Sequence, residues 1–216
     1  GDHRDLHSFP TRRSSDLSTE LRSRWGRIHK DVRLVHNGLD LAVVPPLERE
    51  HVSTEKKVFG YVGTIASWFD WAWVYALAKA RPNDEIRLIG PVFHPPNGKL
   101  PGNVKLLPAC DHPAALKAMT QFQVGLIPFK KNELTASVDP IKYYEYRALG
   151  LPVISTDFGE MRFRSGERGV FITQVESDVS AMAELALQFT GDAGADQAFG
   201  QENTWETRFD AARLLP

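Results

Sequence analysis

Lys142 and Glu145 are two charged residues, three positions apart, whose types and spacing could bind a nucleotide diphosphate. At about 100° per residue, Glu145 lies about 40° from Ile141 on a helical wheel, at the edge of the predicted apolar stripe. A carboxylate there costs free energy unless a donor bonds it. Lys142 adds positive charge to a first turn whose dipole already favours an anion. Lys142 would then hold phosphate oxygens and Glu145 ribose hydroxyls, although a surface ion pair with spacing i,i+3 gives the same pattern.

The residues around this pair predict a helix over Pro140–Leu149. Asp139 is a good N-cap, Pro140 suits the first helical position, and Gly150 can end the helix in a left-handed conformation.

A second candidate for phosphate binding is the turn Gly63-Thr64, which follows the apolar run Val58–Val62. A glycine there allows close approach to the backbone, and the start of the next helix favours an anion. Ser67 could cap that helix, with Asp70 three residues later. A tight strand-to-helix turn without a ligand explains these residues equally well. The motif is not G-x-G-x-x-G, so nothing favours a nicotinamide or flavin cofactor.

The elements that would position these residues alternate between apolar runs and helical segments, which is typical of a parallel sheet covered by helices. The pattern predicts an α/β fold, a Rossmann-like doubly wound parallel sheet that binds ligands at the carboxyl ends of its strands. The predicted strands are Val58–Val62, Glu85–Ile89, Val104–Leu107, Val124–Ile127, Val153–Ser155 and Val170–Ile172. The predicted helices are Trp68–Ala80, Pro113–Gln121, Pro140–Leu149, Asp178–Phe189 and Thr204–Leu214, with a loop over Gly191–Gly200. Upstream we expect a helix over Ser18–Lys30, a strand over Val32–Val35 and a hinge turn at Asn37-Gly38.

Composition excludes several classes of protein. The 216 residues contain 26 Lys and Arg against 27 Asp and Glu, which argues against binding nucleic acid through bulk charge. No apolar run reaches the roughly 20 residues that a membrane span needs. The single cysteine, Cys110, excludes an internal disulfide framework. We expect a cytoplasmic protein.

Residues 1–17 resemble a translated sequencing adapter, most specifically in HSFPTRRSSDL, and are interpreted as a non-native artefact. Residues 18–56 are then the remnant of an interdomain region and linker, and residues 57–216 form the main domain. We therefore expect an N-terminal domain to be missing.

The run DPIKYYEYRALGLPVIST (Asp139–Thr156) resembles the donor-site motif of GT-B glycosyltransferases, particularly the bacterial family 4-like group, also called glycosyl transferases group 1. VRLVHNGLD, VFGYVGTIASWFDW and TWETRF are similar to other segments of that family, in the same order. The resemblance implies the C-terminal, donor-binding domain of a two-domain GT-B fold. It also implies a hexosyltransferase-type enzyme of polysaccharide biosynthesis, of which this fragment alone is inactive.

Carried over by resemblance, the catalytic residues are Lys142 and Glu145, and Glu145 binds the ribose of a nucleoside-diphosphate sugar. Lys142, Gly63 and Thr64 would meet the diphosphate. The donor-binding residues taken together are Gly63, Thr64, Asn132, Thr135, Ser137, Asp139, Lys142, Tyr144 and Glu145. The acceptor, a glycan or lipid-linked molecule, would bind the missing domain, which could also attach peripherally to the inner face of a membrane.

One position departs from the family pattern. Many members carry a glutamate eight residues before the ribose-binding one, where this chain has Ser137, so recognition of the donor sugar must differ. No Asp-x-Asp motif occurs, so we expect no metal and no cofactor besides the donor. His36, His94 and His112 are interpreted as loop residues. The alternatives are a sugar-nucleotide 2-epimerase of the same fold and a non-catalytic nucleotide-binding module.

Overall fold

The computed structural model describes residues 14–16, 18–45 and 55–213. Its centre is a six-stranded, fully parallel sheet with the strand order β5-β4-β3-β6-β7-β8. The strands are β3 (Val58–Val62), β4 (Glu85–Ile89), β5 (Val104–Leu107), β6 (Val124–Ile127), β7 (Val153–Thr156) and β8 (Val170–Thr173). The strand order reverses between β3 and β6, as in doubly wound folds, so ligands are expected beside the carboxyl ends of these two strands. The predicted Rossmann-like fold is confirmed.

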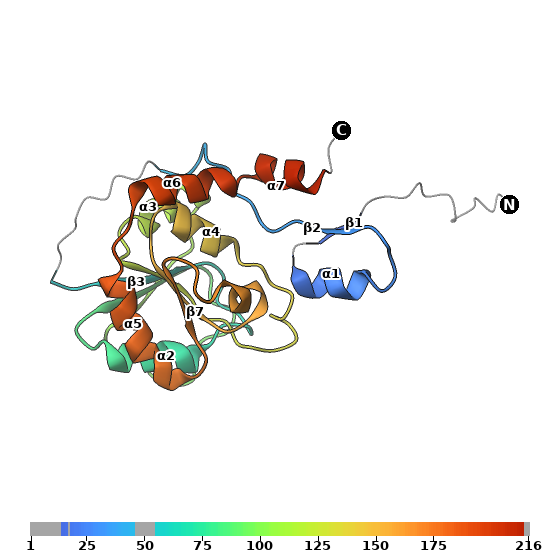
Figure 1. Cartoon of the computed structure of the whole chain (residues 1–216). Coiled ribbons are helices and arrows are strands. Elements are labelled where there is room, and N and C mark those ends of the chain that lie inside the picture. The colour runs from blue at the N-terminus through green and yellow to red at the C-terminus, as the bar shows by residue number, and fades with distance from the viewer. Residues whose placement is uncertain (1–13, 17, 46–54, 214–216) are drawn as a thin grey trace.

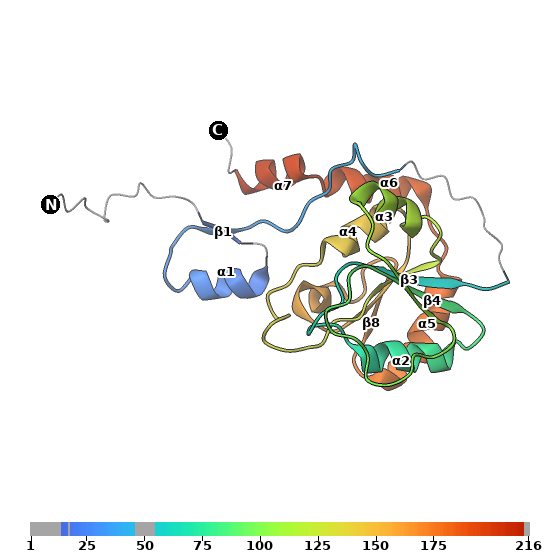
Figure 2. The same cartoon turned by 180° about the vertical axis from the view of Figure 1, so that it is seen from behind.

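Helices cover both faces of this sheet, with α2 and α5 on one face and α3, α4 and α6 on the other (Figures 1 and 2). The helices are α2 (Trp71–Ala80), α3 (His112–Met119), α4 (Ile141–Ala148), α5 (Val179–Gln188), α6 (Ala193–Glu202) and α7 (Trp205–Ala212). The 3₁₀ segments are η1 (Gly159–Arg164) and η2 (Glu176–Asp178).

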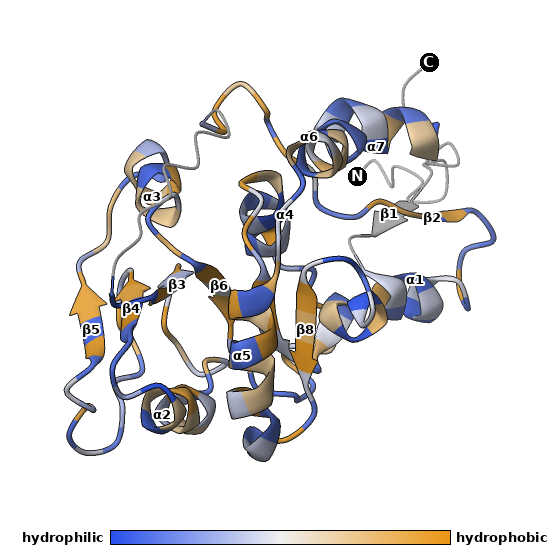
Figure 3. Cartoon of the chain, turned by 60° about the vertical axis from the view of Figure 1, so that its left-hand side comes forward, coloured by the Kyte–Doolittle hydropathy of each residue, from blue (hydrophilic) through white to orange (hydrophobic). Residues whose placement is uncertain are grey.

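The strands form the core because most of their residues are apolar, with hydrophilic positions in β4 and β5, as Figure 3 shows by colour. Phe59, Ile86 and Val124 are completely buried, and the β6 and β7 strands are buried at every position. Two-sided burial is what helices on both faces of a parallel sheet require. The apolar runs therefore predict all six strands correctly.

Several predictions about helix ends were wrong. Asp70, not Ser67, caps α2, because its carboxylate accepts a hydrogen bond from the Trp73 amide at 3.0 Å. Asp139 does not cap α4; the N-cap position is Pro140, and the Asp139 carboxylate bonds other partners. Gly150 has φ of 67°, the left-handed conformation predicted for the end of α4.

Two segments differ from the prediction because contacts distant in sequence determine their structure. The segment predicted as the loop Gly191–Gly200 contains α6, whose Asp196 is buried against Arg147 of α4 at 3.1 Å. No turn forms at Asn37-Gly38; instead Asn37 donates its backbone N–H to Asp139, and Gly38 lies against Trp205.

A small N-terminal unit lies beside the sheet domain (Figure 1). It contains α1 (Thr19–Trp25) and two three-residue strands, β1 (Ser14–Asp16) and β2 (Val32–Leu34), which pair in parallel. Strand β1 was not predicted, because residues 14–16 belong to the segment interpreted as an artefact. The rest of the interpreted artefact, residues 1–13 and 17, lies outside the described residues.

Within the described part of the chain, every helix is too short or too polar to span a membrane.

Candidate functional site

A cavity of about 520 Å³ opens where the strand order reverses. The loops that follow β3 and β6 form two of its walls, and the first turn of α4 forms a third. Its lining residues are Asn37, Tyr61, Thr64, Trp68, Phe129, Leu134, Thr135, Val138, Asp139, Pro140, Ile141 and Lys142. The volume lies within the range of small-molecule sites.

Lys142 lies in the first turn of α4, at the edge of this cavity and against the Gly63 backbone. A Cβ built on Gly63 would fall 2.4 Å from the Lys142 Cε and 2.7 Å from its Nζ, so any other residue at position 63 would force the end of this side chain to move. Gly63 has φ of 143°, which other residues rarely adopt. Lys142 and the Gly63-Thr64 turn, both predicted to contact the diphosphate, therefore lie side by side, and the diphosphate contact itself stays a prediction.

The ammonium of Lys142 lacks a hydrogen-bond or ion-pair partner among the described residues. Its nearest aromatic contact is the Tyr61 ring, whose centroid is 5.7 Å from Nζ. Burial lowers the pKa of Lys142, and the charge of Glu145 offsets only part of that effect. A cation held without a counter-ion beside a cavity is a candidate anion-binding group.

Glu145 lies one turn further along α4, with only 9% of its side chain exposed. Its Oε1 is 2.8 Å from Nε2 of His112, the first residue of α3. The interpretation of His112 as a loop residue was therefore wrong. No local signal could have found this pair, because the two residues are 33 positions apart.

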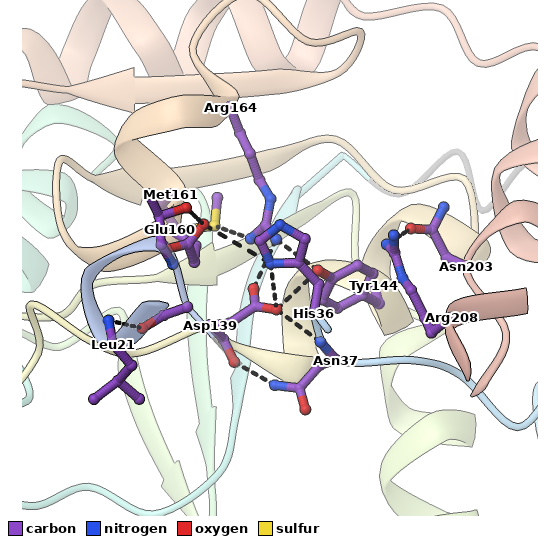
Figure 4. Close-up of polar contacts among 12 residues, drawn as sticks. Leu21, His36, Asn37, Asp139, Tyr144, Glu160, Met161, Arg164, Asn203 and Arg208 are labelled. Atoms are coloured by element: carbon purple, nitrogen blue, oxygen red, sulfur yellow. Dashed lines mark hydrogen bonds and ion pairs between the residues drawn. The ribbon is translucent and has the colours of Figure 1, made fainter. Parts of the chain in front are cut away.

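Asp139 is the centre of a buried polar network (Figure 4). Its carboxylate, which is completely buried, accepts hydrogen bonds from Arg164 at 2.6 Å, from the Tyr144 hydroxyl at 2.9 Å and from the Asn37 amide at 2.8 Å. Burial raises the pKa of the Asp139 carboxyl, but the neighbouring His36, Arg164 and Asn37 outweigh burial and hold its pKa below the usual value. The cavity therefore borders a carboxylate whose two oxygens are already occupied.

The same network joins the N-terminal unit to the sheet domain. The Nδ1 atom of His36 lies 3.4 Å from Asp139 and 3.8 Å from Glu160 of η1. Glu160 in turn accepts hydrogen bonds from the backbone N–H and the hydroxyl of Thr19, at 2.6 and 3.1 Å. These contacts hold residues 18–40 against the side of the cavity that contains Asn37.

Tyr144, predicted to bind the donor, is 1% exposed, and its hydroxyl bonds Asp139 and Arg164. Thr135 lines the cavity, but its hydroxyl donates to the Lys130 carbonyl and its amide bonds the Asn132 side chain at 3.1 Å. Asn132 and Ser137 belong to the same loop and do not line the cavity.

The structure thus brings four of the predicted donor-binding residues to one cavity: Thr64, Thr135, Asp139 and Lys142. Gly63 lies against the Lys142 side chain, whereas Tyr144 and Glu145 are not among the lining residues. Sequence reasoning missed the apolar part of the lining, which consists of Trp68, Phe129, Leu134, Val138 and Ile141. Apolar residues in loops carry no signal that separates a cavity lining from ordinary packing.

The part of the chain that the structure describes contains no cluster of side chains suited to a metal ion. Nowhere in it do three His, Cys, Asp or Glu residues gather so as to hold an ion. The expectation of metal-independent chemistry stays a prediction.

Comparisons with known proteins identify the fold. No family model and no curated protein matches the sequence. Among solved structures, a glycosyltransferase from Rickettsia africae is similar at a TM-score of 0.68 and 11% identity, covering 91% of this chain and 60% of the other. Anabaena HepE, in complex with UDP and glucose, is similar at a TM-score of 0.67 and 14% identity, covering 92% and 61%. AviGT4, a glycosyltransferase involved in avilamycin A biosynthesis, is similar at a TM-score of 0.68 and 13% identity, covering 92% and 60%.

The chain spans about three fifths of the length of these structures. At this level of identity the likeness concerns the fold. The chain has the Rossmann-like fold of one half of a GT-B glycosyltransferase.

Proposed function

We propose that this chain is the donor-binding part of a glycosyltransferase of the hexosyltransferase type. It would bind a nucleoside-diphosphate sugar and support transfer of the sugar to a glycan or lipid-linked acceptor without a metal ion. In a longer protein, an acceptor-binding domain would face the cavity and complete the enzyme, and the fragment alone would be inactive.

The observation that carries this proposal is the ammonium of Lys142, which has no hydrogen-bond or ion-pair partner among the described residues. It lies at the cavity edge, between the apolar lining and Glu145 on the next turn of α4. A diphosphate bound to Lys142 and to the Gly63-Thr64 backbone would extend its sugar into the cavity. Its ribose would then lie toward Glu145.

The chemistry of transfer needs charge stabilisation at the departing diphosphate. As the bond between the sugar and the phosphate oxygen breaks, negative charge accumulates on that oxygen. A preformed cation in a site with little water stabilises such charge more than it stabilises the ground state. Lys142, whose ammonium has no hydrogen-bond or ion-pair partner among the described residues, would supply that stabilisation.

The structural neighbours add support for the donor class. HepE is known in complexes with UDP and with UDP-glucose. Because this chain has the same fold, these complexes favour a nucleotide sugar as its ligand, and a uridine nucleotide is the first to test.

The epimerase alternative is less well supported by the cavity. An epimerase needs acid and base groups beside the sugar. Among the described residues, Asp139 is the one carboxylate in the lining and already bonds Arg164 and Tyr144, and no histidine of that part of the chain lines the cavity.

The test is an NMR titration of the chain with UDP, GDP and ADP, comparing the wild type with Lys142→Met. We expect shifts around Gly63, Lys142 and Glu145 with one nucleotide at millimolar concentration, and their loss in Lys142→Met. Because burial disfavours the charge of Lys142, the variant should be at least as stable as the wild type.

Lys117→Met, at an exposed position of α3, is the matched control and should bind as the wild type does. Binding that survives in Lys142→Met, or no response of the wild type to any nucleotide, would contradict the proposal.

A further inference from the structure

His112 and Glu145 form the closest polar contact between α3 and α4. The His112 Nε2 lies 2.8 Å from the Glu145 Oε1. His112 is the first residue of α3, whose start is capped by the Asp111 carboxylate, which accepts from the Ala114 amide at 2.9 Å. More than half of the His112 side chain remains exposed, so the ring covers Glu145 from the solvent side.

The two oxygens of the Glu145 carboxylate are in different situations. Oε1 accepts from His112, whereas Oε2 is not bonded by any donor in the described residues. Oε2 has no partner among the described residues and is not fully buried, so it is open to solvent. A nearly buried carboxylate with one fixed and one open oxygen can accept a ligand hydroxyl in a defined direction.

We propose that His112 is a positioning residue of the nucleotide site, which holds the Glu145 carboxylate so that Oε2 accepts a ribose hydroxyl. The inference rests on the proposed function, because it assumes a nucleotide beside Lys142. It adds a residue that acts through Glu145 and that sequence reasoning assigned no role.

The charged and titratable groups around the pair are consistent with this role. Lys142, on the same face of α4, is close enough to influence Glu145 but does not bond it. Asp111 is occupied at the helix cap, and the Tyr146 hydroxyl behind Glu145 accepts from the Val62 amide at 3.2 Å. His112 is thus the one group that bonds the Glu145 carboxylate among the described residues.

The experiment measures the affinity of the full chain for UDP and for 2′,3′-dideoxy-UDP, which lacks both ribose hydroxyls. The wild type, His112→Ala and Glu145→Ala are compared by titration calorimetry or NMR. The ratio of the two affinities reports on the ribose contact alone, because all other contacts of the nucleotide are the same.

We expect the wild type to prefer UDP by about tenfold, as a hydrogen bond to a charged group allows. Glu145→Ala should show no preference. His112→Ala should lose about fivefold in affinity for UDP and keep its affinity for dideoxy-UDP. His112→Gln, whose amide N–H can donate to the same oxygen, should recover most of the preference, and no recovery would count against the proposal.

A wild type that binds neither nucleotide would overturn the proposed function together with this inference. A wild type that prefers UDP, with the preference intact in His112→Ala, would overturn only the inference. Equal weakening of both nucleotides in His112→Ala would also overturn it, because that result indicates a general structural role. His29→Ala, at an exposed histidine beyond the sheet domain, is the matched control and should behave as the wild type does.

Discussion

Replacing Asp139 by asparagine should strongly destabilise the fold. The substitution keeps the size of the side chain and removes its charge. It leaves the Arg164 guanidinium, only 7% of which is exposed, without its counter-ion. Removing one partner of a buried ion pair costs about 3–5 kcal/mol, because the other charge stays buried and unpaired.

The contacts of Asp139 support the same magnitude. One oxygen accepts from Arg164 at 2.6 Å, and an asparagine amide in its place would turn donors toward the guanidinium. The other oxygen accepts from Tyr144 and Asn37, and asparagine can retain those bonds. The loss is therefore one charge-assisted bond plus the cost of leaving Arg164 unpaired. No discount for solvent applies, since the Asp139 side chain is fully buried.

Urea denaturation followed by circular dichroism measures this loss. With a typical slope, about 4 kcal/mol lowers the midpoint by about 2 M. Asp157→Asn is the matched control, because Asp157 pairs with Lys131, whose side chain is 68% exposed. A surface pair of that kind is worth about 0–1 kcal/mol.

A loss in Asp139→Asn no greater than in Asp157→Asn would refute the reasoning. If that stable variant also lost nucleotide binding, Asp139 would be a ligand-binding residue rather than a structural one.

Three further predictions concern acidity and two glycines. The folded-state pKa of Asp139 lies below the usual 3.8, so ionised Asp139 stabilises the fold above that pH. This contribution is lost as the pH falls through the folded-state pKa. The free energy of unfolding should therefore fall less steeply with acidification in Asp139→Asn than in the wild type. Gly63→Ala should lower the free energy of unfolding by about 1–3 kcal/mol, measured by thermal or urea unfolding, because φ of Gly63 is 143°. The same substitution should weaken UDP binding by displacing Lys142. Undiminished binding would contradict the placement of Lys142 against Gly63. Gly125→Ala would bring a Cβ to 2.5 Å from the buried Tyr146 ring, so urea unfolding should show a loss of about 1–3 kcal/mol, and a neutral result would mean that the ring can move.

The strands were predictable because their signal is local. An apolar run such as Val124–Ile127 needs only its own residues to show that both faces are buried. The left-handed Gly150 was predictable for the same reason. Helix α6 was not, because Gly194 and Gly200 weaken its apolar pattern and its buried contact is an ion pair with Arg147.

The site was predictable only in part. Lys142 and the Gly63 turn were identified because a glycine after a strand and a cation in a first helical turn are local patterns. Asp139 fits the local sequence pattern of a helix cap, but in the structure it is the ion-pair partner of Arg164, which is 25 residues away. The pairing of Glu145 with His112 likewise depends on how two helices pack.

Helix α4 and the preceding Asp139 therefore carry four charged side chains, and the sequence alone does not show which of them have partners in the fold. Three of them have partners from other elements: Asp139 bonds Arg164, Glu145 bonds His112, and Arg147 bonds Asp196. Lys142 is the exception among them, for no ion pair within the described residues neutralises it. Because an unpaired, partly buried charge costs folding free energy, this charge is the feature from which we propose a negatively charged ligand at Lys142.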